Sequence, residues 1–224
     1  MGHAIGSVLP LAVAVAIFPV PVIAVVLMLG SDNGRAKALA FVLAWIAGLA
    51  GIGAVVLLLA GEIGESDSSG PATWVELVLL ALGIVLVVLA WKQWQGRPRD
   101  GEEPPRPGWM RAIDQLTIAR SAGLALALTV LNPKNLLLAA AAAVEIAQFG
   151  LPADQQAVAL AVFVLVASIG VLAPLVAAVL LGERSRAPLD AVSAWMARHS
   201  AAIMAALFVL IGAKLIGDAI SGLS

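Results

Sequence analysis

The chain has 224 residues, of which 62% are hydrophobic and 12% are charged, and its mean hydropathy is +1.03. A soluble domain is about half apolar and about a quarter charged, so this composition indicates a polytopic membrane protein. The net charge of −1 argues against a nucleic-acid partner. The sequence contains no cysteine, which excludes disulfides, thiolate metal sites and thiol redox chemistry.

Six long apolar segments predict an all-α fold with six transmembrane helices, because each exceeds the ~20 residues that a spanning helix needs. They cover residues 4–29, 37–61, 72–94, 119–148, 154–182 and 198–220. The first segment is too long for a removable signal peptide and follows no basic residue, so we interpret it as the first span. A linker at 95–118, rich in proline, glycine and charge, separates a first three-helix half (1–94) from a second (119–224).

Basic residues predict the orientation of these spans. Of the 13 lysines and arginines, all except Lys134 and Lys214 lie between the first two segments, around the central linker, or between the last two segments. Basic loops face the cytoplasm, so we expect a bacterial cytoplasmic (inner) membrane protein with both termini extracytoplasmic. The stretches 109–116 and 188–196 each place apolar residues on one helical face, which fits either interfacial helices on the cytoplasmic leaflet or ordinary helix starts.

The two halves carry signs of an internal repeat. The pattern Phe-Val-Leu followed by glycine at 41–48 recurs at 163–170, an offset of 122, and Pro19 and Pro21 in the first segment match Pro133 in the fourth. Because each half has three spans, the halves would cross the membrane in opposite senses. Proline-broken segments at matching places in two inverted halves are typical of a transporter site near the midplane.

The strongest functional signal is Asn132-Pro133-Lys134-Asn135, near the middle of the fourth segment. The 24 residues between Arg120 and Glu145 contain no other charge. A lysine at such depth costs roughly 2.5–3.5 kcal/mol on insertion scales, so its side chain should face protein or trapped water.

Each proline also removes a backbone donor, which should free the carbonyls of Val15, Ile17 and Thr129. We therefore predict a shared polar chamber that attracts an anionic or strongly polar headgroup. The predicted substrate-binding residues are Pro19, Pro21, Asn132, Pro133, Lys134 and Asn135.

The remaining features predict packing and exposure rather than chemistry. Gly48 and Gly170 are expected at close helix contacts, and Pro174 is expected to form a hinge or a static kink. Lys214 is expected to reach the outer interface, where Glu145 should be solvated. Small-residue faces permit a homodimer.

Signals of catalysis are missing from the sequence. His3 and His199 are isolated, and no phosphate-cradling loop or catalytic pair is present, so we expect no metal, no cofactor and no enzymatic activity.

The segments 18–25 (Phe-Pro-Val-Pro-Val-Ile-Ala-Val) and 132–136 (Asn-Pro-Lys-Asn-Leu) resemble the lysine-exporter (LysE) superfamily. More narrowly, the chain resembles its GAP or Sap branch, the glycopeptidolipid- and sulfolipid-addressing proteins. The resemblance implies six spans in two inverted halves that move cell-envelope lipids or small solutes outward. Val20 stands where the superfamily more often has glycine, which argues against amino-acid export because the glycine's close backbone approach is lost.

These observations leave three functions open. The leading hypothesis is a secondary-type exporter of an envelope lipid or of another molecule with a polar or anionic head, with membrane lipids and this substrate as its partners. A small-solute exporter for amino-acid-like compounds is the second, and a side opening towards lipid would argue against it. The third is a scaffold whose linker 95–118 recruits envelope-lipid synthesis or export machinery.

Overall fold

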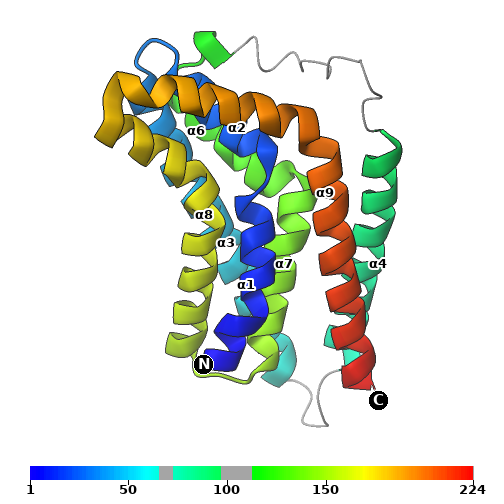
Figure 1. Ribbon diagram of the computed structural model, residues 1–224. Coiled ribbons are helices and arrows are strands. Elements are labelled where there is room, and N and C mark those ends of the chain that lie inside the picture. The colour runs from blue at the N-terminus through cyan, green and yellow to red at the C-terminus, as the bar shows by residue number, and fades with distance from the viewer. Residues whose placement is uncertain (66–72, 97–112, 224) are drawn as a thin grey trace.

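The computed structural model describes residues 1–65, 73–96 and 113–223 and places them in a helical bundle (Figure 1). Most of the linker 95–118, and with it much of the possible interfacial helix at 109–116, lies outside the described residues. The described elements, in chain order, are α1 (Gly2–Ala16), α2 (Pro19–Leu29), α3 (Gly34–Glu65), α4 (Thr73–Gln95), the short η1 (Ile113–Gln115), α6 (Ile118–Leu126), the π-helical η2 (Ala127–Leu131), α7 (Pro133–Gln148), α8 (Ala153–Leu181), the 3₁₀ turn η3 (Gly182–Ser185) and α9 (Arg186–Leu223).

The helices have the length and composition of membrane spans. Within the described residues, three helical stretches can cross a membrane by these criteria, and counting each bent helix pair as one span raises the number to five. The third stretch, Ala153–Gly222, contains both α8 and α9, which run in opposite directions along the bundle (Figure 1). The prediction of an all-α membrane protein is confirmed at this level.

Two helices are broken at the prolines that the sequence singled out. The pair α1 and α2 is bent by 50°, and the pair formed by α6 with η2 and α7 is bent by 64°. Pro19 and Pro133 each begin a new helix, where the missing N–H is not needed. The residues before them, Phe18 and Asn132, are extended with ψ of 120° and 112°, as the steric clash with a following proline requires.

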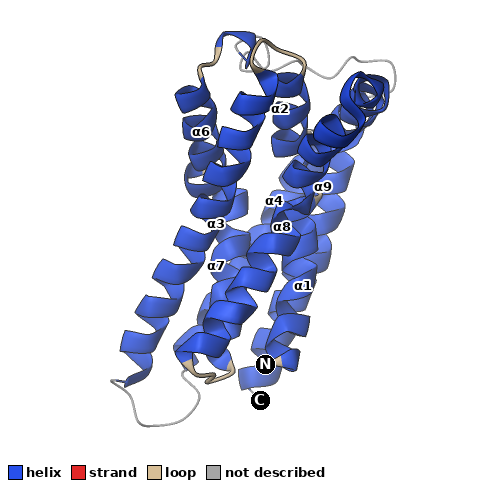
Figure 2. Ribbon diagram, turned by 90° about the vertical axis from the view of Figure 1, so that its left-hand side faces the viewer, coloured by secondary structure: helices blue, strands red, loops and turns tan. Residues whose placement is uncertain are grey.

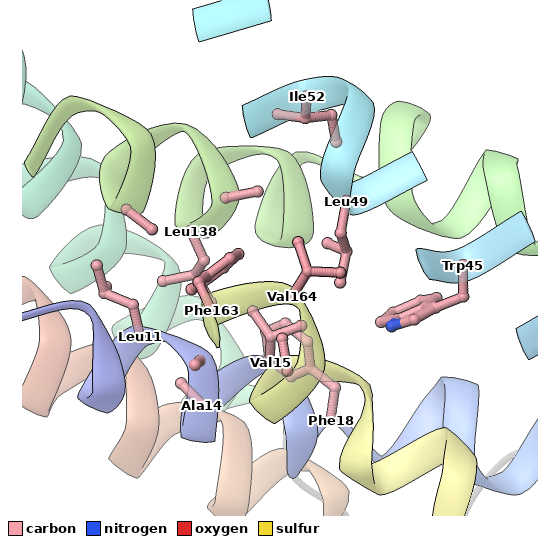
Figure 3. Close-up of a cluster of buried hydrophobic side chains, with 14 of the residues drawn as sticks. Leu11, Ala14, Val15, Phe18, Trp45, Leu49, Ile52, Leu138, Phe163 and Val164 are labelled. Atoms are coloured by element: carbon pink, nitrogen blue, oxygen red, sulfur yellow. The ribbon is translucent and has the colours of Figure 1, made fainter. Parts of the chain in front are cut away.

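The hydrophobic core lies between α1, α3, α7 and α8 (Figure 3). Leu11 and Val15 of α1 point towards Leu138 of α7 and Phe163 of α8, and all four side chains are buried. Next to them, Trp45 stacks on Phe41 within α3, with ring centroids 6.2 Å apart. The contiguous alanines of α7, 139–143, keep that helix thin enough for its neighbours to pack closely around it.

Helices α4 and α9 form a separate pair at one side of the bundle (Figure 1). They pack on each other more extensively than on any other helix and contact the rest mainly through α2 and α7. Two glycines allow this approach: a Cβ atom on Gly83 would lie 2.9 Å from the carbonyl oxygen of Gly212, and one on Gly212 would lie 2.9 Å from that of Gly83. We call α4 and α9 the outer pair, and the other long helices the core.

Helix α9 begins twelve residues before the predicted sixth segment, at Arg186 instead of 198. Its first part, which includes 188–196, lies across one end of the bundle before the helix turns along it (Figure 1). Figure 2 shows this part nearly end-on. The structure thus confirms a helix at 188–196, and its placement at the membrane interface stays a prediction.

Candidate functional site

At the break between α1 and α2, the carbonyl of Val15 has a backbone hydrogen-bond donor. The N–H of Phe18 donates to the carbonyl of Val15 over 3.2 Å, so the prediction that Pro19 frees this carbonyl is wrong. Pro19 and Pro21 occupy the first and third positions of α2 and are buried. Helix starts leave their first amides without intrahelical acceptors, and two prolines there remove two such donors. The prolines therefore start a helix with little need for polar partners.

The second break is held by its two asparagines. The side-chain oxygen of Asn132 accepts a hydrogen bond from the backbone N–H of Lys134 over 3.1 Å, which caps the start of α7. The side-chain amide of Asn135 donates to the carbonyl of Leu128 over 2.7 Å, within the π-helical turn. Asn135 is 1% exposed, and its side-chain oxygen has no hydrogen-bond partner among the described residues. Both asparagines thus stabilise the bent backbone.

Each break also packs against a glycine from the long helix of the other half. A Cβ atom on Gly48 of α3 would overlap the side chain of Thr129 in η2. A Cβ atom on Gly170 of α8 would overlap the carbonyl oxygen of Ala16, at the end of α1. Pro174 lies buried inside α8, four residues further on. Gly48 and Gly170 therefore lie where the sequence expected close packing.

Lys134 faces the outer pair. Its Nζ donates to Oε1 of Gln93 on α4 over 2.9 Å and lies 5.5 Å from the ring centroid of Phe208 on α9. Phe208 is fully buried and meets Phe18 edge to face, with centroids 6.1 Å apart. One aromatic ring, that of Phe208, thus contacts Phe18 at the first break and lies near Lys134 at the second. The amine's partners come from α4 and α9 instead of from the carbonyls of the opening helix.

The position of Gln93 identifies the partner of the amine. Gln93 lies two residues before the end of α4, so Lys134 meets α4 near the last turn of that helix. Gln93 was visible as a polar residue at the end of an apolar segment, but nothing in the sequence connected it to Lys134. Phe208 gave no signal, because an isolated phenylalanine in an apolar span is indistinguishable from a packing residue.

The second lysine in a span has a different environment. Nζ of Lys214 lies 2.8 Å from Glu145 Oε1 and 2.7 Å from Asp218 Oδ2. The Glu145 side chain is only 3% exposed, so the expectation that it is solvated is wrong. By contrast, no carboxylate among the described residues forms an ion pair with Lys134, whose neighbours are an amide and an aromatic ring.

Two hollows lie near these residues, although neither includes the six predicted substrate-binding residues. A groove of about 520 Å³ runs between the helices of the outer pair and is almost entirely apolar. Its lining residues are Val87, Ala90, Trp91, Trp94, Ala202, Ala205, Ala206, Val209 and Leu210. A polar pocket of about 420 Å³ lies between the α2–α3 turn and the α8–α9 turn and includes Arg35 and Arg186.

The length and composition of the helices, including the two bent pairs, define an α-helical polytopic membrane protein. The model of the family described as Sap, sulfolipid-1-addressing protein, matches residues 8–221, and the chain belongs to this family. The resemblance to the Sap branch is thereby confirmed, whereas placement in the LysE superfamily stays a prediction. No curated protein and no solved structure matches the chain.

Proposed function

We propose that this protein is a secondary-type transporter that moves an envelope lipid with an anionic headgroup outward across the bacterial cytoplasmic membrane. The observation that carries the proposal is the half-buried amine of Lys134, which has no carboxylate partner among the described residues. An ionised group in a membrane span is costly and marks a substrate or ion pathway by default. An anionic headgroup would supply the missing countercharge. The family description supports this substrate class, since a sulfolipid is anionic.

The arrangement of the ends supports six crossings. The bent pairs give one crossing each, α3 and α4 one each, and α8 and α9, which run in opposite directions, two more. Both termini then lie at one end of the bundle (Figure 1). The basic residues of the turns lie at the opposite end, among them Arg35, Arg184 and Arg186. Basic turns face the cytoplasm, so the termini are extracytoplasmic.

The pairing of helices supports two inverted repeats. If α1 corresponds to α6 with η2, α2 to α7, α3 to α8 and α4 to α9, most contacts have an equivalent. The contact of α3 with α6 matches α1 with α8, and that of α4 with α7 matches α2 with α9, whereas α1 with α7 lacks a match of comparable size. The glycine contacts are also equivalent between the two halves, since Gly48 of α3 packs against the second break and Gly170 of α8 packs against the first. Inverted repeats of this kind place substrate sites at their interface.

The groove of the outer pair favours a lipid over a small solute. Its lining includes the exposed apolar side chains of Trp91 and Leu210, together with the buried Ala90 and Ala205. On α4, Gln93 lies between the groove residues Ala90 and Trp94, and on α9, Phe208 lies between Ala205 and Val209. An acyl chain in the groove would therefore run beside the headgroup site at Lys134. A soluble amino acid would have no use for an apolar hollow that faces lipid.

The test is transport of fluorescent lipids in proteoliposomes, comparing a sulfated headgroup with a zwitterionic one on the same acyl chains. The variant Lys134→Met removes a charge-assisted contact of about 1.5–3 kcal/mol and should weaken sulfated-lipid binding by about 10- to 100-fold. Gln93→Glu places a carboxylate beside the amine and should inhibit similarly by replacing the substrate's charge. Lys92→Met, one residue away on an exposed position, is the matched control and should transport normally.

Transport of the sulfated lipid by Lys134→Met at the wild-type rate would remove Lys134 from the site. Release of an amino acid trapped inside the vesicles, without lipid movement, would assign the protein to small-solute export. The scaffold hypothesis predicts the reverse pattern, in which removal of most of the linker 95–118 abolishes function and Lys134→Met does not.

A further inference from the structure

An ionic cluster with one buried carboxylate joins the outer pair to the core at the end of the bundle opposite the basic turns. Lys214 of α9 lies between Glu145 of α7, at 2.8 Å, and Asp218 of α9, at 2.7 Å. Exposure rises along the cluster, from 3% for the Glu145 side chain to 25% for Lys214 and 47% for Asp218. Water therefore reaches Asp218, while Glu145 lies on the protein side of the cluster.

The charges of this cluster do not balance. Two carboxylates and one ammonium carry a net charge of −1, which is costly where the dielectric constant is low. One added proton neutralises the cluster. If that proton binds Glu145, Lys214 keeps Asp218 as its counter-ion, so no charge is left unpaired. The cluster is thus built to exist in two states that differ by one proton.

Within the cluster, one buried carboxylate oxygen is available to receive the proton. Oε2 of Glu145 is inaccessible to solvent and has no hydrogen-bond partner among the described residues, while Oε1 is bound to Lys214.

The other titratable side chains described at this end are more exposed than Glu145, although Oε2 of Glu76 is also inaccessible to solvent and has no hydrogen-bond partner among the described residues. On α4, Glu76 accepts a hydrogen bond from Gln148 of α7 over 3.2 Å. His3 of α1 and Asp154 of α8 are exposed. Among the described side chains, these contacts and the Glu145–Lys214 pair are the polar links between α7 and the outer pair at this end. Of these links, the Glu145–Lys214 contact is the ion pair, so it is the one whose charge attraction a proton on the carboxylate removes.

We propose that Glu145 is the binding site of the coupling proton, an inference that rests on the proposed transport function. A proton from extracytoplasmic water forms an O–H bond at Oε2 of the Glu145 carboxylate, and Lys214 stays an ammonium paired with Asp218. Neutral Glu145 keeps a hydrogen bond from Lys214 at Oε1 but loses the charge attraction, which weakens the link between α9 and α7 at this end and favours opening of the interface between the outer pair and the core. Loss of the proton restores the ion pair and closes it.

The first experiment measures sulfated-lipid transport in proteoliposomes with and without a proton gradient that is acidic on the extracytoplasmic side. The wild-type rate should rise with the gradient. Glu145→Gln, an isosteric mimic of the protonated acid, should give the same rate with and without it. Asp218→Asn keeps Glu145 and should keep the gradient dependence, with its midpoint at more acidic pH because a neighbouring negative charge is gone. A Glu145→Gln variant that responds to the gradient as the wild type does would overturn the proposal.

The second experiment reads the proton directly and does not need transport. In infrared spectra of the reconstituted wild type, acidification should produce the band of a protonated buried carboxyl group, and Glu145→Gln should lack it. The same band in both proteins would refute the assignment. If the wild type moves no lipid, the proposed function fails, while the infrared titration still decides whether Glu145 binds the proton.

Discussion

Replacement of Gly170 by alanine tests the contact between α8 and the first break. A Cβ atom there would overlap the carbonyl oxygen of Ala16 and lie 2.9 Å from its carbonyl carbon and 3.3 Å from Cγ2 of Val22. A backbone carbonyl cannot rotate away, so either α8 or the broken helix must move. Overpacking of this kind costs about 1–3 kcal/mol, and an immovable neighbour places the cost near about 3 kcal/mol. Alanine has a helix propensity about 1 kcal/mol more favourable than that of glycine, so the net loss in the free energy of unfolding is about 2 kcal/mol.

Gly51 provides a matched control within another long helix, because no atom lies within 4 Å of a Cβ built there. Gly51→Ala should therefore gain about 1 kcal/mol, and the two variants should differ by about 3 kcal/mol. At about 2–4 °C per kcal/mol for a chain of this size, their melting temperatures should lie about 6–12 °C apart. The assay is thermal unfolding in detergent followed by tryptophan fluorescence. A Gly170→Ala protein that melts at or above Gly51→Ala would show that α8 does not press on the Ala16 carbonyl.

Two further substitutions test the second break. Gly48→Ala should also destabilise the protein, but the obstacle is the side chain of Thr129, so the double variant with Thr129→Ala should recover part of the melting temperature; no recovery would contradict the contact. Asn132→Ala should cost about 0.5–2 kcal/mol through loss of the cap on α7, whereas Asn132→Ser, which can still cap, should cost less in the same unfolding assay. Equal losses in the two Asn132 variants would show that the cap is not what the side chain contributes.

The helices and their breaks could be predicted because local physics decides them. The bounds of the apolar segments predicted those of the long helices α3, α4 and α8 to within a few residues. The breaks could be predicted because a proline inside a membrane helix removes a backbone hydrogen-bond donor. A helix at 188–196 was predicted, but its continuation into the sixth segment as one helix from Arg186 was not, because Pro188 and Asp190 are typical of a turn as well as of a first helical turn. In the structure these residues form the first helical turn and not a separate turn, because α9 is continuous from Arg186.

The partners of the site residues could not be predicted, because they come from distant parts of the chain. Lys134 was singled out from the sequence as a cation within an apolar segment, yet Gln93, its hydrogen-bond partner, is 41 residues away in another helix. Glu145 was expected in solvent because it stands near the end of a segment, and only the position of Lys214 on α9 explains its burial. The asparagines were read as substrate ligands, but their contacts are with the backbone of their own broken helix.

In the proposed cycle the two lysines have different roles at one interface: Lys134 binds the headgroup, and Lys214 forms the contact that the proton weakens. Lys134 and Lys214 both lie where the outer pair meets the core, the first without a counter-ion and the second with two carboxylates. Fewer residues meet across this interface than within the outer pair, so the proposed cycle moves the pair as a unit. A headgroup at Lys134 would strengthen the contact at the cytoplasmic end, whereas a proton at Glu145 weakens it at the other. Two ligands that bias one rigid movement are thermodynamically coupled, and each must change the affinity for the other by the same factor.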